Sequence, residues 1–556
     1  MENLPGFRQP PKQHPLPKPR KPIVTAQPQT YLHIQIGADL IANVIRPTLG
    51  PRPRLVAIER LKRTDPPEFL DDGATIARRI IEIQPRGNDV GAMLIRHALW
   101  RMHTQAGDGA ATMAVMYQSI LREGICCVTR GCNAMLLRTG LEKGLAAVLT
   151  HLRQSAMPLI GKQHITKMAE GLCQGDYEMA ALLGEIFDIV GSDGLIVVEG
   201  SDGRGLEREY LEGTYWKLSG WFSRLFVNDV AQKRAMLEEA ALLISDLDVQ
   251  EPQQLIPVLE KCVKAGVKKL VIIARNVSNR VIGLLVSNNH AKTIQALAVR
   301  TPRIGEMERV AAMEDIAALT GGRIFYSAAH SSFEDFRPED LGRARRVWAT
   351  ESLFGIYGGK GDPRQIRKHI ARIRARLIDA DDERDKADLQ DRLGRLHGGT
   401  VILRVGGVHT VEREARKGMA ERAVKILRNA IAGGVVPGGG VALLNTQSAL
   451  MGLPASNEEE AFAYKILARA LEEPMRAIAA NAGYAPEEIV AKAKSLPSGW
   501  GFNACSGHIV DMKQAGILDS VHTLQKALEI AVGGASIALT TDVIVHHRMP
   551  VESLEP

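Results

Sequence analysis

The sequence predicts a multidomain α/β protein with mostly helical ends and an inserted α/β module between them. Its 556 residues are too many for one hydrophobic core, and the usual domain size suggests two to four domains. Hydrophobic residues make up 45% of the chain, aromatic residues only 4%, and 52 residues are glycine, which suits closely packed helices joined by glycine turns. Strand-like and helix-like segments alternate between residues 212 and 399, which indicates the inserted module.

The N-terminal half of the helical part is predicted to run from residue 29 to about residue 154. Apolar residues recur three and four positions apart in residues 36–45 and again from Val90 onward. A mixed stretch follows to about residue 211. Within it, a glycine turn leads into a short β-branched strand in residues 191–200.

The middle of the chain has the pattern of an α/β module. Residues 240–246 and 268–274 read as buried strands, and the segment between them reads as an amphipathic helix. Residues 363–395 combine dense charge with apolar positions at helical spacing, which predicts a long surface helix or a helical pair. Beyond residue 400 we expect a strand, a helix at about 419–432, a glycine turn at 433–440 and then further helices.

The first 30 residues are predicted to form a disordered, proline-rich basic tail. They hold eight prolines and five Lys or Arg residues against one acid, which leaves about +3 of the net charge of +7 for the rest of the chain. Proline has no backbone donor, so this stretch favours an extended, solvated chain. A tail that contacts nucleic acid or an acidic surface is the alternative to a plain extension. The near balance of charge in the folded part disfavours nucleic acid as a partner.

Neither a signal peptide nor a membrane span is predicted. No apolar core follows the basic residues at the start, and no run of about 18 apolar residues occurs. The six cysteines lack the paired CxxC spacing of zinc sites. These observations predict a cytoplasmic protein with no membrane partner and with reduced, mostly buried thiols.

Two glycine turns that open helices could bind phosphate. In AGDGAAT (106–112), the glycines allow a close backbone approach, the following helix offers free N–H groups, and the Asp108 carboxylate could hold Mg²⁺. PGGGVALL, from Pro437, could offer backbone donors in the same way. Each turn taken by itself is more often purely structural.

Two further turns lie far from these in sequence. PTLGPRP (47–53) is a tight turn after a helix, and FLDDGATIA (69–77) places Asp71 beside Asp72, where the carboxylates could position a metal ion or a water molecule. The alternative is a hairpin turn that needs no function. No GxxxxGK[ST] loop, kinase string or HExxH is present, and the fifteen histidines show no convincing pairing. A nucleotide site here must therefore be of another type.

Read together and in order, these turns resemble those of the group I chaperonins, the bacterial and organellar 60 kDa ring proteins, over nearly all of residues 30–547. One such string would be weak evidence, but six in order at the family's spacing are highly specific. The strings are TLGP (48–51), DDGATIA (71–77), AGDGAAT (106–112), AAMEDIAALTGG (311–322), VVPGGGVALL (435–444) and GFNA with GILDS (501–504 and 516–520). The chain is therefore identified as a divergent member of that family.

The resemblance implies the chaperonin fold, in which an intermediate and an apical domain are nested within a mostly helical equatorial domain. The expected ranges are 1–30 for the tail, 31–154 and 433–547 for the equatorial ATP-binding domain, 155–211 and 400–432 for the intermediate domain, 212–399 for the apical client-binding domain, and 548–556 for a flexible C-terminus. The implied function is a subunit that binds ATP and unfolded polypeptides and assists protein folding in a stacked ring of its own copies. A 10 kDa co-chaperonin is a further partner that the resemblance suggests.

The resemblance also implies an ATP site with Mg²⁺, and with K⁺ as a second ion. Asp108 is the expected Mg²⁺ ligand, Asp72 matches a carboxylate close to the γ-phosphate, and Asn503 and Asp519 match residues that hold the base and the ribose. The residues expected around ATP are Thr48, Leu49, Gly50, Pro51, Asp71, Asp108, Gly109, Ala110, Ala111, Thr112, Gly439, Asn503, Ala504, Cys505 and Asp519.

Three departures from the family pattern affect the implied ATP site: two concern phosphate binding, and the third puts ATP hydrolysis in doubt. Ala110 and Ala111 replace two hydroxyl residues that bond phosphate, and Asp71 replaces a lysine. Arg422 stands where the family has the aspartate that orients the attacking water, and a guanidinium cannot accept a proton from water. Glu421 is adjacent but points about 100° away on a helix. Whether the chain is an ATPase is therefore open, and the alternative is a hydrolysis-deficient holder or a subunit that mixes with an intact paralogue.

Client binding is expected on apolar residues of the apical domain. An exposed apolar groove can hold many unfolded chains, because apolar burial is non-directional. Each of these residues could instead belong to the core of that domain. The set is Trp221, Leu225, Phe226, Ile256, Leu259, Ile282, Leu285 and Val286.

Overall fold

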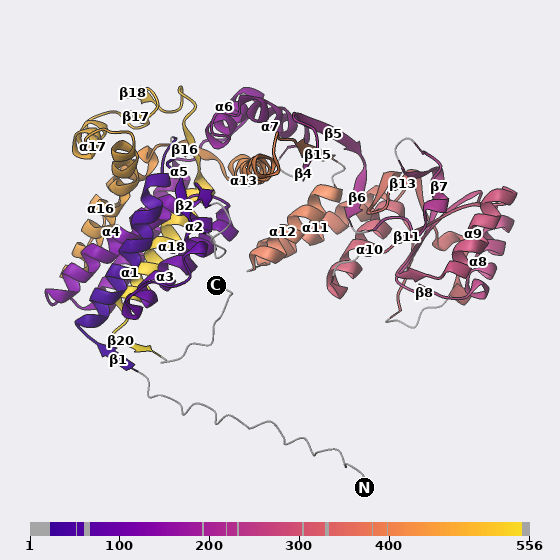
Figure 1. Ribbon diagram of the computed structural model, residues 1–556, viewed down its shortest axis with the longest axis horizontal. Helices are drawn as coiled ribbons and strands as arrows, with labels where there is room; N and C mark the ends of the chain where they lie inside the picture. The colour runs from indigo at the N-terminus through magenta and orange to yellow at the C-terminus, as the bar shows by residue number, and fades with distance from the viewer. Residues whose placement is uncertain are drawn as a thin grey trace, which may run out of the picture. The chain divides into compact units, whose positions relative to one another are not determined.

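The chain folds into two compact units, shown in the computed structural model of Figure 1. Unit 1 contains residues 1–156 and 436–556, and unit 2 contains residues 157–435. Each unit has its own hydrophobic core. The structure describes residues 23–51, 53–59, 67–191, 194–217, 219–230, 233–302, 305–327, 333–380, 382–396 and 399–546.

Unit 1 is a helical bundle built from both ends of the chain. Its helices are α1 (Gln29–Ile45), α2 (Gly73–Arg79), α3 (Asp89–Ala106), α4 (Ala110–Thr129), α5 (Ala134–Gln154), α14 (Val441–Asn445), α15 (Gln447–Met451), α16 (Glu458–Asn481), α17 (Pro486–Lys494) and α18 (Val521–Leu539), with 3-10 turns η1 (Arg46–Thr48) and η2 (Arg86–Asn88). The C-terminal α18, yellow in Figure 1, packs among α3, α4 and α5 from the N-terminal part.

Small residues allow these helices to approach closely. A Cβ on Gly37 of α1 would collide with the carbonyl oxygen of Asn88, and one on Gly91 of α3 would collide with the carbonyl oxygen of Ile34. Only glycine permits such backbone contact, because a methyl group at either position would push α1 and α3 apart. The predicted use of small residues in packed helices is confirmed here.

Short strands complete unit 1. They are β1 (Ile23–Ala26), β2 (Val56–Ile58), β3 (Glu68–Leu70), β17 (Trp500–Asn503), β18 (His508–Asp511), β19 (Leu518–Ser520) and β20 (Val543–His546), and β16 (Val435–Pro437) leads into the unit. β1 pairs antiparallel with β20, with Ile23 opposite His546.

The tail predicted for residues 1–30 ends earlier than expected. The β-branched residues of β1 form a ladder with β20, and α1 already begins at Gln29. Residues 23–30 therefore belong to the fold. Residues 1–22 and the predicted C-terminal segment 548–556 lie outside the described residues.

Unit 2 contains the predicted α/β module. Its central sheet has the order β11-β9-β7-β13-β14-β6, with β12 paired to β7, and it is parallel from β11 to β7 and antiparallel beyond. The strands are β6 (Thr214–Lys217), β7 (Ala235–Ser245), β9 (Lys269–Ala274), β11 (Gln295–Arg300), β12 (Ile324–Phe325), β13 (Gly342–Ala349) and β14 (Leu353–Gly359). The short β8 (Asp248–Val249) and β10 (Asn276–Val277) pair with each other.

A second sheet in unit 2 joins distant segments in the order β4-β15-β5. Its strands are β4 (Leu195–Gly200), β5 (Leu206–Glu212) and β15 (Gly399–Val405). The helices of the unit are α6 (Lys162–Leu172), α7 (Tyr177–Val190), α8 (Ile256–Lys264), α9 (Asn279–Ala291), α10 (Glu306–Thr320), α11 (Pro363–Asp379), α12 (Glu383–Leu396) and α13 (Thr410–Gly433).

The charged stretch 363–395 forms the predicted helical pair, α11 and α12, but part of its charge is buried. Asp315 of α10 is fully buried, and its carboxylate lies 2.8 Å from Nε2 of His369. Arg392 donates to both oxygens of the same carboxylate, at 3.0 and 2.8 Å. A buried cluster of charged side chains therefore joins α11 and α12 to α10. The other faces of the two helices are solvated, as predicted.

The cysteines are less buried than predicted. All six are free, but only Cys173 and Cys262 are buried, while Cys505 is exposed. Across the described residues, no helix has both the length and the apolarity needed to cross a membrane.

Candidate nucleotide site and client surface

The loop after α1 is held in place by the neighbouring helix α16. Thr48 closes η1 by donating its hydroxyl hydrogen to the carbonyl oxygen of Ile45 at 2.8 Å. The side-chain amide of Asn481 donates to the carbonyl oxygens of Arg46 and Leu49, at 2.9 and 2.8 Å. The turn continues through Gly50 at φ +112°, a conformation that favours glycine. The predicted loop Thr48 to Pro51 is therefore a fixed backbone turn. Asn481 is an anchor that sequence reasoning missed.

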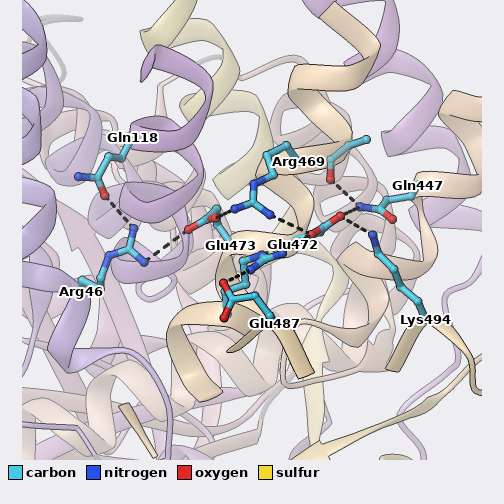
Figure 2. A network of polar contacts seen from close by, with 10 residues as sticks. Arg46, Gln118, Gln447, Arg469, Glu472, Glu473, Glu487 and Lys494 are labelled. Atoms are coloured by element: carbon cyan, nitrogen blue, oxygen red, sulfur yellow. Dashed lines mark hydrogen bonds and ion pairs between the residues drawn. The ribbon is translucent and has the colours of Figure 1, made fainter. Parts of the chain in front are cut away.

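A polar network behind this loop fixes the side of η1 that faces α16. Figure 2 shows the Arg46 guanidinium between Gln118, at 2.8 Å, and Glu473, at 3.4 Å. The neighbouring Glu472 is buried and receives hydrogen bonds from Gln447, Arg469, Arg476 and Lys494. Burial alone would raise the pKa of the Glu472 carboxyl, but hydrogen bonds from Lys494, Gln447 and Arg476 outweigh it and lower the pKa. A charged carboxylate therefore ties α15, α16 and α17 together beneath the loop.

The start of α2 carries the pair Asp71 and Asp72. Asp72 is the N-cap of α2, where its Oδ2 accepts a hydrogen bond from the backbone N–H of Thr75 at 2.9 Å. The next residue, Gly73, lies against the start of α4, because a Cβ there would be 3.6 Å from Cβ of Ala110 and 3.7 Å from the nitrogen of Ala111. The acidic turn and the AGDGAAT turn therefore meet, although some forty residues separate them.

The AGDGAAT turn has the conformation that the sequence predicts. Gly107 and Gly109 have φ values of +81° and +86°, and α4 begins directly after them at Ala110. The exposed Asp108 lies between the two glycines. The first N–H groups of α4 therefore open at this turn, next to a carboxylate, although Ala110 and Ala111 offer no hydroxyl.

The C-terminal turns reach the same region. A Cβ on Gly109 would be 2.8 Å from Cγ2 of Thr523, and a Cβ on Gly438 would be 3.1 Å from Oδ1 of Asp519. Gly439, at φ +66°, lies against Phe502, since its Cβ would be 3.7 Å from that residue's carbonyl oxygen. Side chains at Gly109, Gly438 and Gly439 would fill the space between these turns, which we call the glycine-lined cradle.

Asp519 and Asp108 lie close enough to affect each other. Burial, and to a smaller extent the negative charge of Asp108, raise the pKa of Asp519 to about 6. The hydroxyls of Ser520 and Thr523, beside Asp519, are buried and have no hydrogen-bond partner in the described part of the chain. Two converging carboxylates and unsatisfied hydroxyls are oxygen ligands of the kind that a hard cation with bound phosphates would satisfy.

The residues present thus fit Mg²⁺ and a nucleotide. The described residues contain no group of three or more His, Cys, Asp or Glu side chains that could hold a metal by themselves. Mg²⁺ commonly uses one or two carboxylates and takes its other ligands from phosphate and water. Asp108 would be the protein ligand, and phosphate oxygens would complete the coordination.

The turn between β17 and β18 holds the remaining predicted nucleotide contacts. Oδ1 of Asn503 accepts from the backbone nitrogens of Cys505 at 2.9 Å and Ser506 at 3.4 Å. Ala504 is buried, while Cys505 is exposed. The side-chain oxygen of Asn503 therefore stabilises the turn that contains it. The side-chain N–H groups of Asn503 remain for hydrogen bonds to a base.

The predicted client residues divide into exposed and buried side chains. Leu225 is 70% exposed and Ile256 is 39% exposed, whereas Trp221 and Val286 are partly buried against the core. Phe226, Leu259, Ile282 and Leu285 are all buried members of the unit 2 core. For these four the alternative of a core position holds. Leu259 lies on α8, Ile282 and Leu285 lie on α9, and Phe226 ends the 3-10 turn η3 (Arg224–Phe226). Val230 and Val263, which are 78% and 44% exposed, are further exposed apolar residues of unit 2 that the predicted set does not include.

Arg422 lies within α13 of unit 2. Its neighbours Ala420 and Ala423 are buried, whereas Glu421 is exposed and pairs with Lys417, 3.9 Å away, one turn earlier. The two adjacent residues therefore point in different directions, as the helical geometry requires.

The chain matches known proteins along most of its length. The model of the TCP-1/cpn60 chaperonin family matches residues 41–189 and 233–548. The chain is also similar to the crystal structure of the chaperonin gp146 of bacteriophage EL (Pseudomonas aeruginosa) in presence of ATP-BeFx. In crystal form I the TM-score is 0.69 at 17% identity, covering 94% of this chain and 98% of that one.

Crystal form II of the same phage protein gives a TM-score of 0.61 at 16% identity, covering 94% of this chain and 99% of that one. At such low identity the likeness shows the fold alone, and it confirms the predicted multidomain chaperonin fold. Together with the family match across both parts of unit 1 and most of unit 2, it leads to one conclusion: the chain belongs to the TCP-1/cpn60 chaperonin family.

Proposed function

We propose that this chain is an ATP-binding chaperonin subunit that captures unfolded polypeptides and assists their folding within a ring of its own copies. The observation that carries the nucleotide part is the convergence of turns from both chain ends, with Asp108 and Asp519 close together in a glycine-lined cradle. The phage chaperonin of similar fold was crystallised in presence of ATP-BeFx, which supports the same proposal.

The proposed roles follow from the position of each turn. The α4 N-terminus and the loop Thr48 to Pro51 would bind phosphates through backbone groups, and Asp108 would hold Mg²⁺. Asp519 and Asn503 would contact the sugar and the base, and Asp72 would face the γ-phosphate. Bound Mg²⁺ would offset the unfavourable proximity of the two carboxylates.

The proposed division into domains follows the sequence ranges given above. Unit 1 would act as the equatorial domain, the β4-β15-β5 sheet with α6, α7 and α13 as the intermediate domain, and the seven-stranded sheet with its helices as the apical domain. Leu225, Val230, Ile256 and Val263 would form the client-binding face, because they are the exposed apolar side chains near α8 and the loop before β7.

A holder that binds but does not hydrolyse ATP is the second candidate function. The observation that favours it is Arg422, which puts a guanidinium where the family has a proton-accepting carboxylate. Such a subunit could work alone or mix with an intact paralogue.

The test is steady-state ATP hydrolysis by the purified full-length chain in Mg²⁺ and K⁺, beside direct binding of ATP to the same preparation. Binding with turnover supports the cycling chaperonin. Binding without turnover supports the holder, and Arg422→Asp should then restore hydrolysis. Failure to bind ATP at millimolar concentration would contradict both forms of the proposal.

A further inference from the structure

An imidazole lies beside the carboxylate at the start of α2. Nδ1 of His103, on α3, is 3.8 Å from Oδ2 of Asp72. This nitrogen is buried and has no hydrogen-bond partner among the described residues. The imidazole side chain as a whole remains 31% exposed, so the ring is sunk at its Nδ1 edge but still reachable.

The His103 ring is held in one orientation by its neighbours. It stacks on the indole of Trp100, with ring centroids 5.3 Å apart and an angle of 17° between the planes. The guanidinium of Arg78 covers the Trp100 ring at 4.4 Å. Asp72 and Arg78 belong to the two ends of α2, so this short helix faces the imidazole at Nδ1 with a carboxylate and covers the stacked indole with a guanidinium.

The helix α2 is itself rigidly placed. Asp72 caps its N-terminus through Thr75, and the buried Arg96 of α3 donates to the carbonyl oxygens of Ile80 and Ile81 just beyond its C-terminus, at 3.1 and 3.2 Å. The hydrogen bonds from Arg96 therefore join α3 to the C-terminal end of α2, while the cap fixes the Asp72 carboxylate at the other end of the helix.

We propose that His103 is the general base for ATP hydrolysis in this chain, with Asp72 holding its imidazole in the Nδ1–H tautomer. The inference rests on the proposed nucleotide site and answers the question that Arg422 raises. A carboxylate on one imidazole nitrogen leaves the other nitrogen to accept a proton, which is the logic of carboxylate and histidine pairs in hydrolases. Such contacts are often long in ligand-free proteins and tighten when substrate binds.

The proposed step is a hydrolysis that needs no further reactant. An oxygen–phosphorus bond forms between water and the γ-phosphorus of the substrate ATP, while the bond from that phosphorus to the β,γ-bridging oxygen breaks. A proton of the attacking water goes to Nε2 of His103, and the bridging oxygen leaves with its electron pair on ADP. His103 then returns its proton to the released phosphate or to solvent.

The experiment compares ATP binding with single-turnover hydrolysis of ATP in the full-length chain. His103→Gln keeps a polar side chain of similar reach but cannot act as the base, and His97→Gln changes an exposed histidine on the same helix as the matched control. We expect His103→Gln to slow hydrolysis by about 10² to 10⁴-fold with a nearly unchanged Kd for ATP. His97→Gln should change neither quantity.

A second comparison keeps the test valid if one variant folds poorly. Asp72→Asn should also slow hydrolysis, and the double variant should be little slower than His103→Gln alone, because residues that act as a unit are not additive. The proposal is overturned if the wild-type chain binds ATP without turnover, or if His103→Gln binds and hydrolyses ATP normally. Absence of ATP binding by the wild-type chain would instead overturn the proposed nucleotide site beneath it.

Discussion

The proposed nucleotide site and the proposed client surface differ in the part of the polypeptide that forms them. The nucleotide site consists mainly of backbone turns, and its shape depends on glycines such as Gly107, Gly109 and Gly439 at positive φ. The proposed client surface consists of exposed apolar side chains on α8 and in the segment before β7, beside apolar residues that form the core of unit 2. The first site can therefore lose side-chain hydroxyls, as at Ala110 and Ala111, and keep its geometry. The proposed client surface depends instead on the side chains themselves, so replacing an exposed apolar residue there should weaken binding of unfolded chains.

The largest effect on stability is expected from replacing a residue of the predicted client set that the structure buries in the core. Leu285 is fully buried in unit 2, so Leu285→Ala should lower the free energy of unfolding by about 2 to 5 kcal/mol through loss of apolar burial and creation of a cavity. Ile256→Ala, on an exposed position, is the matched control and should change stability little. Denaturant unfolding of the full chain measures both. Equal effects of the two variants would erase the distinction between core and surface on these helices.

The next largest effect is expected on ATP affinity when Asp108, the exposed carboxylate of the proposed nucleotide site, is replaced. Asp108→Asn removes the charge that would hold Mg²⁺, and we expect the affinity for ATP with Mg²⁺ to fall about 100-fold, which corresponds to about 2.7 kcal/mol. Glu123→Gln, on an exposed position of α4, should have no effect. Calorimetric titration with and without Mg²⁺ measures both. If Asp108→Asn bound ATP with Mg²⁺ as tightly as wild type, the backbone turns alone would account for binding.

The same contrast explains which features of the two sites could be predicted from the sequence. Turns rich in glycine and aspartate adopt few backbone conformations, so the strings at 48–51, 106–112 and 437–440 predicted the local shape of the chain. The family resemblance predicted that these turns converge. An apolar residue on an amphipathic helix looks the same whether it faces a sheet or a client. The sequence therefore could not separate Leu285 from Ile256, which differ in the structure from fully buried to 39% exposed.

The residues that sequence analysis missed contact partners on other helices or loops. Asn481 and His103 lie on helices far in sequence from Leu49 and Asp72, their partners, and neither belongs to a recognisable string. The pairing of His103 depends on the contact between α2 and α3, and that of His369 on the contact between α10 and α11. Such tertiary neighbours leave no periodic signal, which is why the histidines showed no pairing in the sequence.

A smaller effect should come from Asp519, the partly buried member of the carboxylate pair. The pKa of Asp519 is raised from 3.8 to about 6, so the folded state favours the protonated form, and ionisation destabilises the fold as pH rises from about 4 through 6. Without nucleotide or Mg²⁺, Asp519→Asn should therefore stabilise the chain by about 1 to 2 kcal/mol at pH 7.5 and by almost nothing at pH 4. Thermal unfolding at both pH values measures this. A loss of stability at pH 7.5 would mean that the Asp519 carboxylate is favourably solvated or paired.

The smallest effect is expected on the exposed side chains, because each contributes only part of a broad apolar face. Ile256→Ser should weaken capture of an unfolded, carboxymethylated protein by a few-fold, roughly 1 kcal/mol for partial loss of apolar burial, without altering the unfolding transition. Ile378→Ser, which replaces an 83% exposed apolar residue on α11, is the control for a general change in surface hydrophobicity. Suppression of aggregation of the unfolded protein, titrated against chaperonin concentration, measures both. If Ile378→Ser weakened capture as much as Ile256→Ser did, client binding would not be confined to the face around α8, and the contrast between a turn-built site and a localised apolar surface would fail.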